Sequence, residues 1–331
     1  MMRLGSLLWL VIAVPAVVAG KKLDLIDLPV GFQPEGVTLA REHTVYVSSF
    51  TGGNVWKGDL QTGVGSVVIK GGNDSVALGM DFDRRSDYLW VCGGFSGSVA
   101  IYDTTDDFSL VAEIQLGSVG SSFTNDVIVH PRASYAYITD SSQLQFYRIG
   151  LDEDGKLPDG PYTVAETIPL SSEFTFRPGD IVLDQAINSE GIVITDDLSS
   201  LIIVNYQSGE LFSVDPDSGK AALIDLGGEV IVGGDGLVLR QNTLWVCQNR
   251  FFGTPDQGVV EVLLSADLSC GTITRRLINE FFNDPASALR KGNSIWTTVT
   301  MWAVPPEDIA TTQYQLVRVD RDSAVSECPA T

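Results

Sequence analysis

A short motif that recurs along the chain constrains the fold more than any other feature of the sequence. Each copy has one leading residue, in most copies a glycine after it, and then a short apolar run. Copies occupy residues 34–39, 78–80, 125–127, 190–192 and 235–237, with a degraded sixth at 285–287. Their leading residues lie 43 to 65 residues apart. Repeats of roughly 40 to 50 residues are typical of the four-stranded blades of β-propellers.

The segments between the motifs have the texture of β-strands. Short runs of β-branched and aromatic residues alternate with Gly, Asp, Asn and Ser, and helical periodicity is nearly absent. Second strands are predicted at residues 44–48, 88–92, 135–139, 201–204, 243–247 and 294–299. Third strands are predicted at 54–57, 98–102, 144–148, 210–214, 258–263 and 315–319. Fourth strands are predicted at 66–69, 110–116, 221–226 and 272–277, and residues 152–189 form an insertion in the third repeat.

The sixth repeat ends after its third strand, so a propeller needs one more strand to close. Residues 23–28 precede the first repeat and have no other pairing partner. We predict that they supply the missing outer strand, which closes the ring and removes exposed sheet edges. The predicted fold is therefore all-β, a single six-bladed β-propeller domain over residues 21–331. An open sandwich of two sheets is the alternative.

The first 20 residues have the pattern of a secretory signal peptide. Arg3 precedes an apolar stretch over residues 4–18, and residues 17–19 resemble a small-residue cleavage site. A signal anchor is the alternative, but the apolar stretch is short for a membrane-spanning helix. No later segment is apolar enough to span a bilayer. We therefore expect a secreted, extracellular protein without membrane contact after cleavage.

The charge balance bounds the class of partner. Asp and Glu number 42 against 21 Lys and Arg, which gives a formal net charge of −21. Such a surface repels phosphate backbones, and no Lys/Arg cluster offsets it, so a nucleic-acid partner is not expected. We expect a monomer that takes a small-molecule substrate.

The four cysteines fall into two groups. Cys92 and Cys247 end near-identical Leu-Trp-Val-Cys segments, so they occupy equivalent positions of separate blades, too far apart to bond. We expect both to be buried apolar residues. Cys270 and Cys328 lie near the last two blades, and the sequence leaves open whether they form a disulfide. Asn73 begins the one N-glycosylation sequon, which has meaning only in a host that glycosylates.

Blades arranged around an axis bring the leading residues of their motifs together. These residues are Glu35, Leu78, Asn125, Glu190, Asp235 and Pro285. Four of the six carry side-chain oxygens. In the fourth repeat Asp180, in a second motif-like segment, competes with Glu190 for this place. Glu190 is preferred because the second strand follows it at the same distance as in the other blades.

Carboxylates gathered at one axis need a partner. Glu35, Glu190 and Asp235 would repel one another and raise one another's pKa values, and a hard divalent cation removes that conflict. All-oxygen ligands with Asn125 among them suit one calcium ion. The two histidines lie near no other candidate ligand, which argues against zinc. The alternative is that these polar residues are turn residues bonded to nearby backbone. The predicted rim of the site consists of Phe50, Phe95, Ser141, Tyr206, Asn249 and Trp302.

These motifs resemble a known superfamily. Glu35-Gly36, Asn125-Asp126, Asp235-Gly236 and segments 139–141 and 203–211 are similar to those of the senescence-marker-protein/gluconolactonase/luciferin-regenerating-enzyme superfamily. The likeness extends over nearly the whole mature chain. It implies a six-bladed propeller with calcium at Glu35, Asn125, the blade-four residue and Asp235. The superfamily's usual blade-four residue is Asn, so Glu190 is a departure that adds negative charge.

The resemblance implies a metal-dependent hydrolase of a lactone or ester. In that hypothesis calcium polarises the carbonyl and lowers the pKa of a bound water. Asp235 or Glu190 accepts the proton. We interpret His43 and His130 as non-catalytic, since neither lies near a plausible nucleophile. The alternative is a non-catalytic secreted propeller that binds a small metabolite or a protein, with a link to secondary metabolism.

Overall fold

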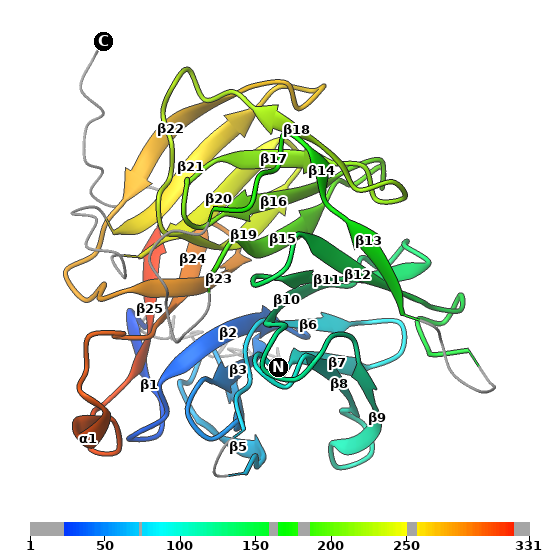
Figure 1. Cartoon of the computed structure of the whole chain (residues 1–331). Coiled ribbons are helices and arrows are strands. Elements are labelled where there is room, and N and C mark those ends of the chain that lie inside the picture. The colour runs from blue at the N-terminus through cyan, green and yellow to red at the C-terminus, as the bar shows by residue number, and fades with distance from the viewer. Residues whose placement is uncertain (1–22, 73–74, 159–164, 178–185, 250–256, 321–331) are drawn as a thin grey trace, which may run out of the picture.

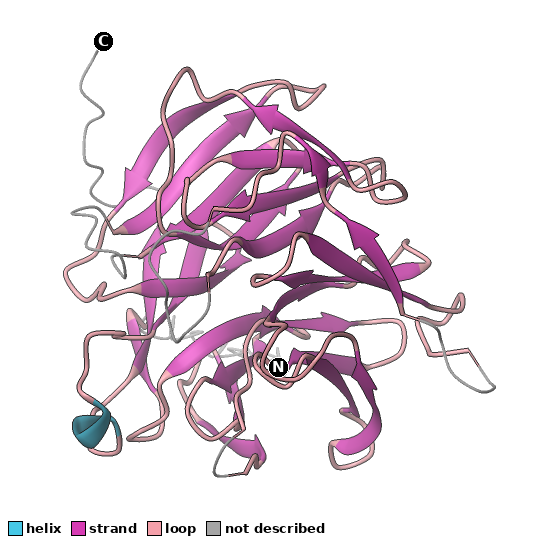
Figure 2. Ribbon diagram, in the orientation of Figure 1, coloured by secondary structure: helices cyan, strands magenta, loops and turns pink. Residues whose placement is uncertain are grey.

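The computed structural model describes residues 23–72, 75–158, 165–177, 186–249 and 257–320, and these form six sheets whose strand pairs are antiparallel in all cases but one. Figure 1 shows the sheets arranged around a common centre. Strands make up nearly all of the regular structure, and Figure 2 shows one short helix, α1 (Pro306–Ile309). None of the helices within the described residues is both long and apolar enough to cross a membrane.

The first three blades have four strands each. Blade one consists of β2 (Pro34–Leu39), β3 (Thr44–Ser49), β4 (Val55–Asp59) and β5 (Gly65–Ile69). Blade two consists of β6 (Met80–Asp83), β7 (Tyr88–Cys92), β8 (Ser98–Asp103) and β9 (Ser109–Gln115). Blade three consists of β10 (Thr124–Ile128), β11 (Tyr135–Asp140), β12 (Gln145–Gly150) and β13 (Glu166–Pro169).

The other three blades complete the circle. Blade four consists of β15 (Ser189–Ile194), β16 (Leu201–Asn205), β17 (Leu211–Val214), β18 (Lys220–Ile224) and β14 (Ser171–Ser172). Blade five consists of β19 (Gly234–Arg240), β20 (Thr243–Gln248), β21 (Gly258–Leu264) and β22 (Gly271–Leu277). Blade six consists of β23 (Pro285–Lys291), β24 (Ser294–Val299), β25 (Gln315–Asp320) and β1 (Leu25–Asp27).

Strand β1 closes the ring, as the sequence predicts. It pairs antiparallel with β25, so that Ile26 lies opposite Leu316, and Figure 1 shows the blue β1 beside the red β25. Ile26 is only 2% exposed, so this short strand is anchored in the core. The innermost strands of neighbouring blades contact one another around the full circle, and β23 contacts β2. The all-β six-bladed propeller is therefore confirmed.

Blade three differs from the sequence prediction. The sequence interpretation treats residues 152–189 as an insertion, but the structure uses part of it as regular strands. Strand β13 pairs with β12 as the outer strand of blade three, and β14 pairs parallel with β18 of blade four. In β13 only Ile168 is buried, and the positions on either side of it face solvent. One buried apolar side chain is too weak a pattern to reveal a strand.

A bulge at the start of the inner strands sets the direction of the leading residues. The pairing of β2, β10, β15, β19 and β23 with the next strand shifts register directly around the motif. Such bulges redirect one side chain out of the pleat. The motif glycine allows close approach, since a Cβ on Gly36 would lie 2.4 Å from the Leu78 carbonyl oxygen. A Cβ on Gly191 would lie 2.4 Å from the carbonyl oxygen of Asp235.

Apolar contacts between neighbouring blades form the core. Cys92 and Cys247 are both fully buried within it, as expected of small apolar residues. Cys270 is exposed, whereas Cys328 lies outside the described residues, so a bridge between them stays a prediction. The Asn73 sequon and the proposed signal peptide over residues 1–20 also lie outside the described part of the chain.

Candidate functional site

A cavity of about 40 Å³ lies at the axis and is lined by residues of several blades. The lining residues are Glu35, Phe50, Leu78, Phe123, Asn125, Ile187, Glu190, Tyr206, Asp235 and Trp302. All four oxygen-bearing leading residues are among them, together with Leu78 of blade two. Pro285 of blade six is not. In blade four the strand that begins at Ser189 presents Glu190 to the cavity. Its rival Asp180 lies outside the described residues.

The polar lining residues are almost completely shielded from solvent. Glu35, Asn125 and Glu190 are each 5% exposed, and Asp235 is 6% exposed. Burial raises the pKa of Glu35, Glu190 and Asp235 well above the ordinary range. Negative neighbours raise each pKa further, with Asp235 acting on both glutamates and Asp126 on all three. Charged carboxylates in this cavity are therefore costly unless a cation compensates them.

Two buried carboxylate oxygens have no hydrogen-bond partner among the described residues. These atoms are Oε2 of Glu35, in blade one, and Oε2 of Glu190, in blade four. An unsatisfied buried oxygen destabilises the folded state unless water or an ion binds it. Both side chains line the same cavity.

Asp235 is held differently from the two glutamates. Asn249 Nδ2 donates a hydrogen bond to Asp235 Oδ2 over 2.8 Å. The hydroxyl of Tyr206 in turn donates to Asn249 Oδ1 over 2.6 Å. This relay fixes the orientation of the Asp235 carboxylate, which also accepts a hydrogen bond from the Gly236 amide.

The donor set fits a hard divalent cation in its chemistry. Three carboxylates and the amide of Asn125 come from four blades, and all are oxygen ligands of the kind that calcium takes. Within the described residues, however, no three His, Cys, Asp or Glu side chains are gathered closely enough to form a metal-binding group. Binding of an ion therefore requires the carboxylates to close on it, and metal binding is a proposal.

Three of the six expected rim residues reach the cavity. These are Phe50, Tyr206 and Trp302. The rings of Phe50 and Trp302 meet edge to face, with centroids 5.0 Å apart and an interplanar angle of 85°. Both residues are half-buried and stand at the opening of the cavity.

The other three expected rim residues do not line the cavity. Phe95 packs edge to face on Phe123, with ring centroids 4.7 Å apart. Ser141 is fully buried and donates from its hydroxyl to the Ser189 carbonyl over 2.6 Å. Asn249 stands behind Asp235. Each of them therefore supports a lining residue or its strand. The rim prediction is wrong for these three because a loop side chain can turn toward the protein as readily as toward the opening.

Two residues that line the cavity, Phe123 and Ile187, are not among those that the sequence predicts. Both precede a leading residue by two or three positions, on the connection that enters an inner strand. A signal for them exists in the sequence, since Phe32 and Phe282 stand three positions before Glu35 and Pro285. Phe32 and Phe282 are buried in the core and do not line the cavity.

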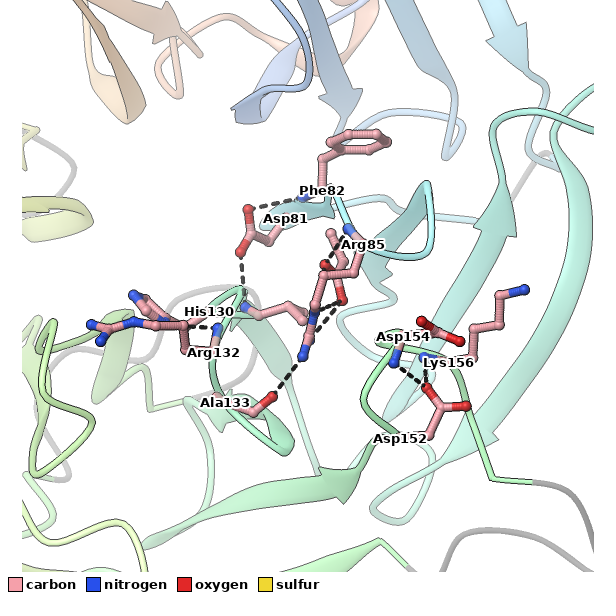
Figure 3. Close-up of polar contacts among 11 residues, drawn as sticks. Asp81, Phe82, Arg85, His130, Arg132, Ala133, Asp152, Asp154 and Lys156 are labelled. Carbon is pink, nitrogen blue, oxygen red and sulfur yellow. Dashed lines mark hydrogen bonds and ion pairs between the residues drawn. The ribbon is translucent and has the colours of Figure 1, made fainter.

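Asp81 and Asp126 are partly buried carboxyls that join neighbouring blades. Asp81, on β6, accepts hydrogen bonds at 2.8 Å from the amides of Phe82 and Val129 (Figure 3). Asp126 accepts from the amides of Val127 (2.9 Å) and Ile192 (3.3 Å). Burial raises the pKa of Asp81 to about 6 and that of Asp126 to about 7.

Neither histidine lines the axial cavity. His130 lies in a turn, and its Nδ1 atom accepts a hydrogen bond from the Arg132 amide over 3.2 Å (Figure 3). Its Nε2 atom lies 3.8 Å from Asp196 Oδ1. Burial lowers the pKa of His130. Its contacts are thus those of a structural residue in a turn.

Comparison with known proteins identifies the fold. No protein-family model matches the chain, and no curated protein sequence does either. The solved structure of the major Malassezia sympodialis allergen Mala s 1 is similar, with 13% identity and a TM-score of 0.59 over 91% of this chain and 97% of the other. A luciferin-regenerating enzyme has 12% identity and a TM-score of 0.59 over 91% and 96%. The Cps50 (Swd1) propeller domain of Myceliophteria thermophila has 12% identity and a TM-score of 0.57 over 91% and 87%. At these identities the likeness shows a β-propeller fold that enzymes and non-enzymes share.

Proposed function

We propose that the axial cavity binds one calcium ion and that the protein is a secreted hydrolase of a lactone or ester. The observation that supports this most strongly is the pair of buried, unpartnered oxygens on Glu35 and Glu190. Asp235 and Asn125 line the same cavity and complete an all-oxygen set of four. Structural similarity to a luciferin-regenerating enzyme is compatible with an enzyme but does not identify a reaction.

When bound, calcium would offset two of the three negative charges of the buried carboxylates and act as a Lewis acid toward a substrate carbonyl. Glu35, Glu190 and Asn125 would hold it. Asp235 is suited to accept a proton from the attacking water, because Asn249 fixes one of its oxygens and burial raises its pKa. Phe50 and Trp302 would hold the rest of the substrate at the opening.

Calcium titration and hydrolysis assays on the same protein test this proposal. Calorimetry should detect one site, and lactone or ester hydrolysis should stop when a chelator is added. Glu35→Gln should weaken calcium binding, whereas Asp235→Asn should remove most hydrolysis. Glu153→Gln, a change at an exposed position that does not line the cavity, is the control. Hydrolysis that chelator leaves unchanged would contradict the metal mechanism.

A non-catalytic binding protein is the second candidate. The size of the cavity favours it, since about 40 Å³ holds an ion with a water but not a whole substrate. A metabolite would then bind through one small group inserted into the cavity. Calcium binding without turnover of any lactone, ester or phosphotriester in a panel would support this candidate over the hydrolase.

A further inference from the structure

We propose that the axial site selects ligands with a positively charged ammonium group and discriminates against anionic ones. The inference deepens the proposed function and names its substrate class, an ester or lactone with a nearby cationic group. It rests on one juxtaposition, in which buried carboxylates lie in the same cavity as four aromatic side chains.

The net charge of the site favours a cationic ligand. Glu35, Glu190 and Asp235 bring three negative charges when ionised, whereas the amide of Asn125 is neutral. A bound calcium ion therefore leaves the site with a net charge of −1. Because these groups are at most 6% exposed, solvent screens that charge weakly. An ammonium group gains from the field, and a carboxylate or phosphate group at the same place is repelled.

The aromatic lining of the cavity also favours a cationic ligand. Phe50, Phe123, Tyr206 and Trp302 all contribute to the cavity wall. Aromatic rings attract cations through their negative faces, and several rings around one cavity are the usual receptor for quaternary ammonium groups. Phe123 and Tyr206 are buried, whereas Phe50 and Trp302 are half-buried at the opening. The cavity thus provides both an inner wall and an entrance of aromatic side chains.

The position of Trp302 is fixed by an acidic neighbour. Its backbone amide donates to Asp284 Oδ2 over 3.1 Å, and Asp284 is itself buried. Asp284 therefore adds an acidic residue next to a side chain that lines the cavity. Acidic residues around an opening raise the local concentration of cations and lower that of anions.

The small volume of the cavity limits what enters it. About 40 Å³ accommodates a compact head group rather than a long chain. We therefore expect only the ester or lactone group to enter the cavity, with the ammonium group against Phe50 and Trp302 and the rest of the ligand outside. Hydrolysis of such an ester would also generate a carboxylate, and its repulsion by the same acidic site would favour release of the acid product.

Three probes of similar shape and different charge test the inference. They are choline, its neutral isostere 3,3-dimethylbutan-1-ol and the anion 3,3-dimethylbutanoate. Calorimetric titration into the full calcium-loaded protein should show that choline binds about tenfold or more tightly than the alcohol. The anion should bind more weakly than both. Equal affinity for choline and the alcohol, or no measurable binding of choline, would overturn the inference.

Variants separate charge from ring contributions. At saturating calcium, which keeps the ion bound, Glu190→Gln removes one negative charge and should weaken choline binding about tenfold while the affinity for the alcohol stays unchanged. Trp302→Leu keeps the charge and should reduce the preference for choline over the alcohol. The exposed change Glu153→Gln should leave all three affinities as they are. A Glu190→Gln protein that keeps the full choline preference contradicts the charge argument.

The same samples distinguish this inference from the proposed function. Calcium binding and ester hydrolysis without any preference for choline would reject the inference and leave the hydrolase standing. Choline selectivity in a protein that neither binds calcium nor hydrolyses esters would reject the hydrolase and retain the ligand class.

Discussion

Thr298 donates a hydrogen bond from its Oγ1 atom to the carbonyl oxygen of Glu35 over 2.6 Å, and 263 sequence positions separate the two residues. Two positions later, Thr300 Oγ1 donates to the Pro34 carbonyl over 2.7 Å. The hydroxyls of Thr298, in β24 of blade six, and of Thr300, just after that strand, therefore hold β2 of blade one at the axis. The bonds fix the backbone beneath the Glu35 carboxylate, one of the two side chains with an unpartnered oxygen.

The same device recurs at the other glutamate. Thr139 Oγ1 donates to the Glu190 carbonyl over 2.9 Å, and Ser141 Oγ donates to the Ser189 carbonyl over 2.6 Å. Two hydroxyl side chains at alternate positions of one blade thus support the leading residue of the next. This explains the Thr139-Asp140-Ser141 segment, whose hydroxyls face the neighbouring blade rather than the cavity.

Thr298→Val should destabilise the protein by about 1 to 3 kcal/mol, because the buried Glu35 carbonyl loses a hydrogen bond and no solvent replaces it. The change should also weaken calcium binding through displacement of Glu35. Urea denaturation with and without calcium measures both effects. Thr272→Val, at an exposed strand position, is the matched control and should leave both unchanged. Equal stability of the two variants would show that the interblade bond has no structural weight.

Calcium affinity should increase with pH. Burial and mutual repulsion raise the pKa values of Glu35, Glu190 and Asp235, so part of the cluster is protonated near neutrality without a cation. Calcium binds the ionised form, and binding must release those protons. Calorimetry in buffers of different ionisation enthalpy should detect release of about one proton or more per ion. Binding without proton release would show that the carboxylates are already ionised.

The calcium-free protein should lose stability as pH rises from about 4 to about 6 and beyond. Asp81 binds its proton more tightly in the folded chain, where its pKa is about 6, than in the unfolded chain, where it is near 4. The folded state then holds the extra proton in that window, so its stability falls as pH increases. The contribution of Asp81 is up to about 3 kcal/mol.

Asp81→Asn tests this pH dependence, because the amide has no proton to lose. Melting temperatures of the calcium-free variant should change less between pH 4 and 7 than those of the unaltered protein. Asp107→Asn, on an exposed turn, should retain the full dependence. The same slope in both variants would exclude Asp81 as its source.

Repetition made the centre of the fold predictable from the sequence. Residues in the same register of successive blades must approach a common axis, so Glu35, Asn125, Glu190 and Asp235 could be placed together without any knowledge of their side-chain contacts. Closure by the N-terminal strand followed from counting, since the sixth repeat lacks one strand. The closure is confirmed by the pairing of β1 with β25, and the four leading residues line one cavity.

The loops and outer strands could not be placed in the same way. Whether Asn249 faces the opening or Asp235 depends on the backbone of one loop, and no repeated pattern reports that backbone. Ser141 is a second example, because its hydroxyl bonds to the next blade. Strand β13 escaped because outer strands bury little, and its alternation rests on Ile168 alone. Metal coordination is also beyond the pattern, since it requires the carboxylates to close on an ion.

Ile26→Asp should open the ring at its closure. The Ile26 side chain is 2% exposed and packs in the same core cluster as Trp296 and Leu316. A charge there loses solvation without a partner, so we expect destabilisation of about 3 kcal/mol or more and detachment of β1 from β25. Hydrogen exchange at the β25 amides and urea denaturation measure the two effects. Val64→Asp places the same side chain at a position that is 72% exposed and should alter neither. Unchanged exchange in Ile26→Asp would mean that blade six is stable without its outer strand.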